Sequence, residues 1–216
     1  VRTYAMTADQ YRPGSYPHSH HSPGGHPLPV PPPPAAPPAR TSGAAGWLLV
    51  VSAAMMGLLS GLFFAFDVSV MPGLARLDDV DYLRAMQSFN DLIDNNGLFG
   101  MLFMAALAAP VWAAIVEYRR GRRRVAVWTA VAAALYLVTV LITVTVNIPL
   151  NTELAGLGDP AKAGDLSLVD DFKNIWEPAN IVRTVLCTAA VVCVAQALKL
   201  HGRSTPRPPA APVSYR

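Results

Sequence analysis

The chain has 216 residues, of which 52% are hydrophobic and 14% are charged, and its formal net charge is +3. An average soluble domain is about 25% charged, so this composition excludes an ordinary soluble domain. The hydrophobic residues are gathered into blocks, which indicate an all-α integral membrane protein.

The first segment, residues 1–43, is rich in proline and carries four of the five histidines of the chain. Such a segment cannot bury enough apolar surface to fold, so we predict a disordered tail with stretches of polyproline geometry. The stretch "PVPPPPAAPP" suits docking to cytoplasmic protein partners. The histidines could bind a metal weakly, although incidental histidines are the simpler interpretation. A second disordered tail of the same kind is predicted for residues 201–216.

Four stretches between these tails are long enough to cross a bilayer, which takes about 20 apolar residues. We therefore predict a four-helix transmembrane bundle over residues 44–200, with spans at about 46–66, 97–116, 125–146 and 178–198. The first span is longer than the apolar core of a secretory signal and begins far from the N-terminus, which indicates a membrane helix. The lipid bilayer is then the principal partner of the chain.

The first span carries small residues four positions apart, at Ala53, Gly57, Gly61 and Ala65. Small residues at this spacing let membrane helices approach closely. We predict that this stripe is the seam of the bundle, with a homodimer face as the alternative.

The link between the second and third spans, "EYRRGRRR", contains five arginines. Short loops rich in Lys and Arg stay in the cytoplasm, so both termini of this multi-pass cell-membrane protein are predicted to be cytoplasmic. With that orientation 12 of the 17 Lys and Arg residues lie on the cytoplasmic side, and 12 of the 14 Asp and Glu residues lie on the other. Membrane topology thus explains the arginine run without nucleic-acid binding.

The two outer segments are predicted to be partly helical. In "DDVDYLRAMQSFNDLIDNNG", an Asp can cap the start, Asn-Gly can stop the end, and Leu83, Met86, Asn90 and Ile93 recur at helical spacing. The third span is expected to end at "NIPLN", because Pro149 disfavours helical geometry at Ile148. A loop follows, and then a short helix that runs up to the fourth span.

Polar residues gather at the outer ends of the spans. Trp176, Asn180, Arg183 and Cys187 share one helix face. A charge inside the membrane usually faces the bundle interior and pairs with another group, and for Arg183 we expect Asp67, with Glu153 as the alternative. Each polar residue alone is explained by snorkelling, interface anchoring or helix termination, but together they predict a pocket. Its predicted members are Asp67, Asn90, Asn147, Asn151, Trp176, Asn180 and Arg183.

The sequence lacks the residues and motifs that several kinds of metal, cofactor and catalytic site require. No histidine lies in a predicted span or outer loop, which removes the usual ligands of haem and of di-iron bundles. The sequence also lacks a P-loop, a dinucleotide glycine motif and a Ser-His-Asp set. We therefore expect no metal and no tightly held cofactor. The absence of evident internal repeats disfavours a transporter.

Four motifs together resemble one known family. They are "GLFFAFDVSVMPGL" (61–74), "MQSFNDLIDN" (86–95), "VNIPLNTEL" (146–154) and "WEPANIVRT" (176–184). Over about residues 46–200 the chain resembles the anthrone oxygenase-like family of small four-helix membrane proteins, which includes many uncharacterised bacterial members. Its best-known members resemble fungal enzymes that oxidise an anthrone to an anthraquinone with molecular oxygen.

The resemblance implies a cofactor-independent monooxygenase that acts on an anthrone-like or other aromatic polyketide substrate. An anthrone has an acidic methylene, and its enolate can react with oxygen without a metal, given an apolar slot, a base and oxyanion donors. The residues expected to be catalytic are Arg183, Asp67, Asn147 and Asn180, with Asp67 or Glu153 as the base. The residues expected to bind substrate are Asn90, Asn151, Glu153 and Trp176, with Trp176 stacked on the rings.

The competing interpretation is a non-catalytic membrane protein. In that case the same polar groups tie the four helices together, and the proline-rich tails bind cytoplasmic partners.

Overall fold

The computed structural model describes residues 43–203, and every regular element within them is helical. This confirms the predicted all-α fold. The two predicted tails lie outside the described residues, except for Gly43 and for residues 201–203, which are helical.

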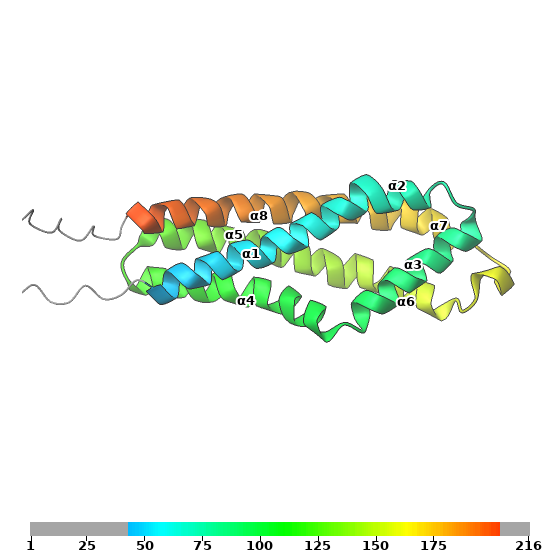
Figure 1. Ribbon diagram of the computed structural model, residues 1–216, viewed down its shortest axis with the longest axis horizontal. Coiled ribbons are helices and arrows are strands. Elements are labelled where there is room, and N and C mark those ends of the chain that lie inside the picture. The colour runs from blue at the N-terminus through cyan, green and yellow to red at the C-terminus, as the bar shows by residue number, and fades with distance from the viewer. Residues whose placement is uncertain (1–42, 204–216) are drawn as a thin grey trace, which may run out of the picture. The chain divides into compact units, whose positions relative to one another are not determined.

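Four continuous helices in this part of the chain are long and apolar enough to cross a membrane, as expected for a multi-pass membrane protein. They run over Gly43–Leu74, Gly97–Arg119, Arg123–Gly156 and Leu168–Arg203. Their α-helical parts are α1 (Gly43–Ala65), α2 (Met71–Leu74), α4 (Gly97–Arg119), α5 (Arg123–Ile142), α6 (Ile148–Gly156), α7 (Leu168–Asp171) and α8 (Glu177–Arg203). The short helix α3 (Asp79–Asp94) precedes α4, and a single 3₁₀ turn (Pro160–Lys162) follows α6 (Figure 1).

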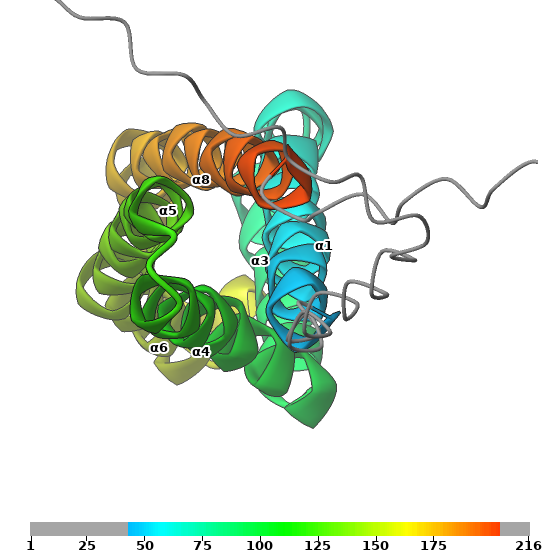
Figure 2. The same cartoon turned by 90° about the vertical axis from the view of Figure 1, so that its left-hand side faces the viewer.

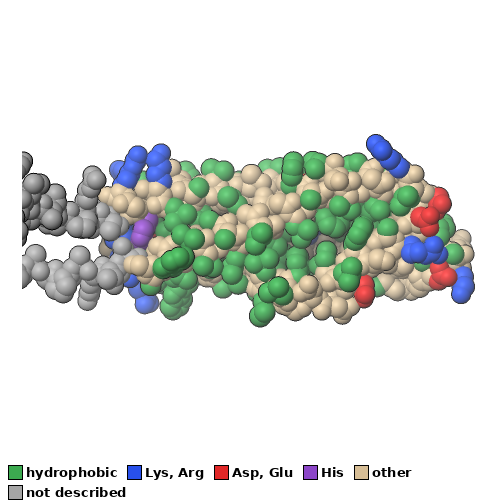
Figure 3. All heavy atoms as spheres, in the orientation of Figure 1, with side chains coloured by type: hydrophobic (Ala, Val, Ile, Leu, Met, Phe, Trp, Pro, Cys, Tyr) green, Lys and Arg blue, Asp and Glu red, His purple; other side chains and the backbone are tan. Residues whose placement is uncertain are grey.

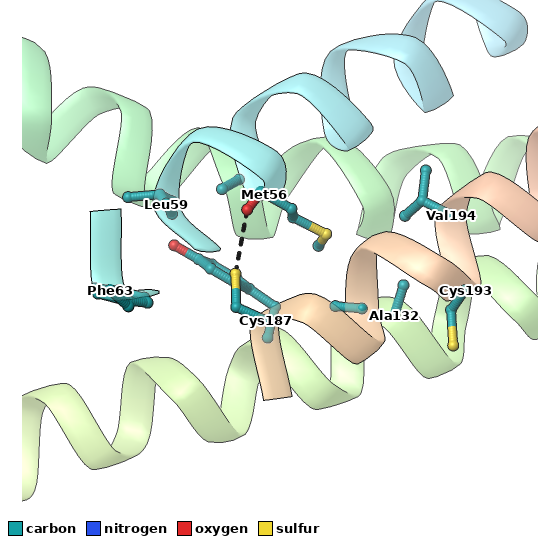
Figure 4. Packing of buried hydrophobic residues seen from close by; sticks show 10 residues of the cluster. Met56, Leu59, Phe63, Ala132, Cys187, Cys193 and Val194 are labelled. Carbon is teal, nitrogen blue, oxygen red and sulfur yellow. Dashed lines mark hydrogen bonds between the residues drawn. The ribbon is translucent and has the colours of Figure 1, made fainter. Parts of the chain in front are cut away.

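The four long helices form a ring in which α1 packs against α4 and α8, and α5 packs against the same two helices (Figure 2). The central layer of the core is built from all four long helices, with Met56, Ala106, Tyr136 and Cys187 fully buried. The Cys187 thiol donates to the Met56 carbonyl oxygen at 3.3 Å and so joins α8 to α1 (Figure 4). Large apolar side chains cover the outside of the bundle, as lipid contact requires; examples are Trp47, Leu58, Leu98, Met101, Val185 and Val192.

The small-residue stripe of α1 is not the seam of the bundle, and that prediction was wrong. Gly57, Gly61 and Ala65 are exposed, and a Cβ atom added at either glycine would meet nothing within 4 Å. The seam is instead formed by another face of α1, which buries Leu49, Ser52, Met56, Leu59 and Phe63, and of the stripe only Ala53 packs partly against the core. Both faces of α1 are apolar, so spacing alone could not tell which one packs inward.

The expected helix end at "NIPLN" was also wrong. The helix continues to Gly156 through a π-helical turn, Thr143–Asn147, in which the backbone bond is i to i+5 instead of i to i+4. Two further π turns, Phe66–Val70 and Phe172–Trp176, lie in the first and fourth long helices. They also lengthen those helices beyond the predicted spans.

The two ends of the bundle carry different charges. Arginines gather where α4 and α5 join, which we call the arginine end, and most acidic side chains gather around α3 and α6, which we call the acidic end (Figure 3). At the arginine end, His201 is buried in the last turn of α8, although it was assigned to the tail. Its Nδ1 lies 3.1 Å from Glu117 Oε1 and 3.1 Å from a terminal nitrogen of Arg122.

The predicted outer helix is confirmed as α3. Asp78 caps its start by accepting a hydrogen bond from the Asp81 backbone N–H at 2.9 Å. Leu83 and Met86 are fully buried against a cluster that includes Leu154, Phe172 and Trp176. This packing holds α3 over the acidic end of the bundle, so Asn90 on the same face of α3 points at the ends of the membrane helices.

Candidate functional site

A cavity of about 220 Å³ lies toward the acidic end and is lined by residues of α1, α3, α4, α6, α8 and the three π turns; we call it the aromatic pocket. A buried cavity of about 150 Å³ is enough for one benzene ring, so this cavity is large enough for a somewhat larger planar molecule. Five aromatic side chains lie in its wall: Phe63, Phe66, Phe99, Phe103 and Trp176. The polar part of the wall is formed by Asn90, Thr143, Asn147, Asn151, Asn180 and Arg183.

The three π turns supply much of this wall. Phe66 lies in the first π turn, Thr143 and Asn147 in the second, and Trp176 at the end of the third. A π turn inserts one extra residue per turn and so re-aims the side chains beyond it, and such turns are frequent at functional sites. The periodicity of an ideal α-helix does not reveal them.

Arg183 is the charge in the pocket wall, and its side chain is almost fully buried. One terminal nitrogen donates to Asn180 Oδ1 at 2.6 Å, and the other donates to the Thr143 hydroxyl at 3.2 Å. The guanidinium carbon lies 4.5 Å from the ring centre of Phe63 and 5.5 Å from that of Trp176. The aromatic faces and neutral acceptors therefore stabilise this cation.

The direct ion pair expected between Arg183 and a carboxylate is not formed within residues 43–203. Asn180 stands between Arg183 and Asp67: its Nδ2 donates to Asp67 Oδ1 and, at 2.9 Å, to the Phe63 carbonyl oxygen. The Thr184 hydroxyl donates to Asp67 Oδ2 at 2.6 Å. With both amide hydrogens on the side of Asp67 and Phe63, the Asn180 oxygen faces Arg183. Asp67 is thus linked to Arg183 indirectly, through the side-chain amide of Asn180.

Three atoms of the pocket wall are buried without a hydrogen-bond partner: Asn90 Nδ2, Asn147 Oδ1 and Arg183 Nε. The side chains of these residues are only 7%, 1% and 5% exposed. An unsatisfied buried polar atom costs about 1–3 kcal/mol. Two donors and one acceptor without a partner thus belong to residues that line one cavity.

Of the two predicted residues of α6, Asn151 lies in the pocket wall and Glu153 does not. The Trp176 indole N–H donates to Asn151 Oδ1 at 2.9 Å, which fixes the ring in the wall. Glu153 is exposed and is not part of the wall, because it lies on the outward face of α6. Of the eight predicted site residues, the structure places six in the pocket wall, Asp67 behind it, and Glu153 away from it.

Tyr82 of α3 supports the acidic end next to the site. Its hydroxyl donates to Glu177 Oε1 at 3.4 Å, and burial, together with the Glu177 carboxylate, raises the pKa of Tyr82 above its ordinary value. The phenol therefore stays protonated and keeps its donor role.

Sequence reasoning missed several contributors to the wall, among them Phe63, Thr143, Phe99 and Phe103. Thr143 bonds back to the Thr139 carbonyl oxygen at 2.8 Å and presents its oxygen to Arg183. Of these residues only Thr143 lies in a π turn, and Pro149, which follows that turn, is its one sequence signal.

A protein-family model described as "Anthrone oxygenase" matches residues 92–193. The chain belongs to the anthrone oxygenase-like family. The match runs from the end of α3 into α8, and among the wall residues it includes are five that were predicted from the sequence: Asn147, Asn151, Trp176, Asn180 and Arg183. Phe63 of α1, Asp67 of the first π turn and Asn90 of α3 lie before the matched region and complete the site of this anthrone oxygenase-like protein. No curated protein and no solved structure matches the chain.

Proposed function

We propose that this anthrone oxygenase-like protein is a membrane oxygenase that oxidises a planar aromatic ketone with molecular oxygen. It does so without a bound metal or nucleotide. The observation that carries the proposal is the set of unsatisfied atoms Asn90 Nδ2, Asn147 Oδ1 and Arg183 Nε around an aromatic-walled cavity. An anthrone-like molecule offers both a flat ring system and the oxygen atoms to meet them.

Binding of the rings is favoured by the aromatic wall. Trp176 lies 5.9 Å from Phe66 and 6.0 Å from Phe172, ring centre to ring centre, and these contacts hold it in place as a stacking surface. The ketone oxygen accepts from Arg183 Nε, and Asn147 Oδ1 accepts from a ring hydroxyl.

Arg183 is suited to stabilise an enolate oxygen. Its nearest acceptors are an amide and a hydroxyl, so its positive charge is not cancelled by a carboxylate in direct contact. A preorganised donor aimed at a developing negative charge in a water-poor site is among the strongest catalytic effects. The cation therefore lowers the free energy of the enolate relative to the ketone.

The proposed reaction begins with loss of one methylene proton to water, which gives the enolate. The enolate carbon attacks O₂, and the resulting peroxide takes up a proton. Loss of water then leaves a new carbonyl, so one oxygen atom ends in the quinone and the other in water. Both oxygens of Asp67 are engaged by Asn180 and Thr184, so we assign Asp67 a positioning role.

The test is oxygen uptake by the purified protein with a hydroxyanthrone as substrate, which offers both the ketone oxygen and a ring hydroxyl, alongside Arg183→Gln. Loss of one oxyanion donor typically lowers turnover by about 10²–10³-fold, and we expect a loss of that size. The matched control is Arg84→Gln, which removes an exposed arginine of α3 that pairs with Asp81 at 3.2 Å and Asp159 at 3.3 Å. The control should turn over the hydroxyanthrone at the wild-type rate.

The proposal fails if wild-type protein does not exceed the uncatalysed rate, or if folded Arg183→Gln retains full turnover. If Arg183→Gln does not accumulate, Asn147→Ala provides the same test with a smaller change. Failure of both variants to accumulate, with no turnover by the wild type, would favour the non-catalytic interpretation. That interpretation is supported by the bonds through which Asn180 ties α8 to α1.

A further inference from the structure

A second hollow, of about 480 Å³, adjoins the aromatic pocket, and we call it the vestibule. Its walls come from α3, through Gln87, Asn90 and Asp91, and from α6 and the turn that follows it, through Asn151, Ala155 and Gly158. Asn90 and Asn151 line both cavities. These two amide side chains therefore lie between the two spaces.

The vestibule differs from the aromatic pocket in its chemistry. Its side chains are mainly amides, and no aromatic residue and no Lys or Arg lies among its described lining residues. Gln87 Nε2 donates to the Leu154 and Gly158 carbonyl oxygens at 2.9 and 2.7 Å, which ties α3 to the end of α6. The wall is thus held in place without a ligand.

The junction between the cavities carries an unsatisfied donor. Asn90 is 7% exposed, and its Nδ2 has no hydrogen-bond partner. A group that extends from the aromatic pocket toward the vestibule would pass the Asn90 side chain, so a ligand that occupies both spaces could engage this donor.

We propose that the vestibule binds an uncharged, hydroxylated substituent of a ligand whose aromatic rings occupy the aromatic pocket. The inference rests on the proposed function for the aromatic pocket and specifies the substrate class further. Hydroxyl groups both donate and accept, as amides do, so they match this lining. An anionic substituent would meet the Asp91 carboxylate with no cation beside it. A cationic substituent would compete with Asn95, whose Nδ2 already donates to Asp91 Oδ1 at 2.7 Å.

The test compares three anthrones that differ only in an ether substituent: methoxy, 2,3-dihydroxypropoxy and carboxymethoxy. Each substituent is placed in turn at every free position of one outer ring, so that at least one isomer of each compound can direct its substituent toward the vestibule. Dissociation constants are measured by equilibrium dialysis without oxygen, which prevents turnover. We expect the best dihydroxypropoxy isomer to bind about tenfold more tightly than its methoxy counterpart, the effect of one or two hydrogen bonds. The carboxymethoxy isomer should show no such gain.

The matched variants lie on α6. Ala155→Phe fills the vestibule from an exposed position and should abolish the tenfold gain while leaving methoxyanthrone binding unchanged. Thr152→Phe adds the same ring to the same helix at an exposed position outside both cavities, and it should leave the gain intact.

The inference is overturned if no dihydroxypropoxy isomer exceeds its methoxy counterpart, or if Ala155→Phe weakens both ligands equally. The vestibule would then be a solvent channel only. Methoxyanthrone binding without the gain would leave the proposed function standing, whereas failure of every anthrone to bind would remove both proposals.

Discussion

Asn180 determines how the buried arginine is used. A direct pair between Arg183 and Asp67 would satisfy the cation but leave little of its charge for a ligand. With the amide between them, Asp67 orients Asn180, Asn180 accepts from one arm of Arg183, and Arg183 Nε stays unsatisfied at the pocket wall. The helical period predicted that Asn180 and Arg183 share a face. It could not predict the amide bridge, because that depends on which helix end comes to lie beside them.

The bridge can be tested at this scale by Asn180→Leu, which keeps a similar volume but removes three hydrogen bonds. Both Asp67 and Arg183 then lose a partner, and we expect a loss of about 2–4 kcal/mol in the free energy of unfolding. Unfolding by SDS in mixed micelles measures it.

The control is Thr188→Val, because Thr188 bonds to Ser60 at 2.8 Å and so also joins α8 to α1, but at an exposed position. Its loss should be below about 1 kcal/mol. An equal loss of unfolding free energy in both variants would show that the Asn180 bridge stabilises the protein no more than an exposed hydrogen bond does.

At the scale of the elements, each π turn ends two residues before a proline. The turns Phe66–Val70, Thr143–Asn147 and Phe172–Trp176 are followed by Pro72, Pro149 and Pro178. A proline in a helix has no N–H and its ring clashes with the carbonyl of residue i−4. A wider turn before the proline relieves that clash and lets the helix continue. Pro110 lies in α4 without a π turn, so proline alone is not sufficient.

Replacement of Pro149 by alanine tests this relation. The variant removes the reason for the second π turn, so the helix can close to regular α geometry and rotate Asn147 out of the pocket wall. We expect unfolding free energy at or above that of the wild type, since alanine is the better helix former. Affinity for a hydroxyanthrone should fall about tenfold or more, because Asn147 Oδ1 loses its hydrogen bond to the ring hydroxyl.

Pro110→Ala is the control for this prediction, because Pro110 lies in a membrane helix but outside the pocket wall. Its hydroxyanthrone affinity, measured by the same anaerobic dialysis, should equal that of the wild type. If Pro149→Ala binds with wild-type affinity, the second π turn is not required for ligand binding.

For the whole molecule, the decisive feature is charge at the two ends. Arginines mark the end where α4 joins α5, and the aromatic pocket and the vestibule lie toward the acidic end. From the positive-inside rule we predict that both cavities lie toward the outer face of the membrane. A polar substrate group would reach the vestibule from outside the cell.

Cysteine labelling in intact cells tests this orientation. Lys162→Cys, at a side chain that is 85% exposed beyond α6, should react with a membrane-impermeant maleimide added outside. Arg120→Cys, exposed at the arginine end, should react only after lysis. The native Cys187 and Cys193 are buried, so their background should be low. The reverse pattern would place both cavities on the cytoplasmic side.

The sequence by itself determined the four membrane helices, their order, the capped outer helix and the shared face of Trp176, Asn180 and Arg183. Hydrophobic length, capping residues and the helical period are local properties, so they can be read from the chain. Only the tertiary structure decided that the small-residue stripe faces outward, that Glu153 lies away from the site, and that the helices continue past Pro72 and Pro149. These outcomes depend on which apolar face finds a neighbour and which partner reaches each buried polar atom, and both are properties of the packed bundle.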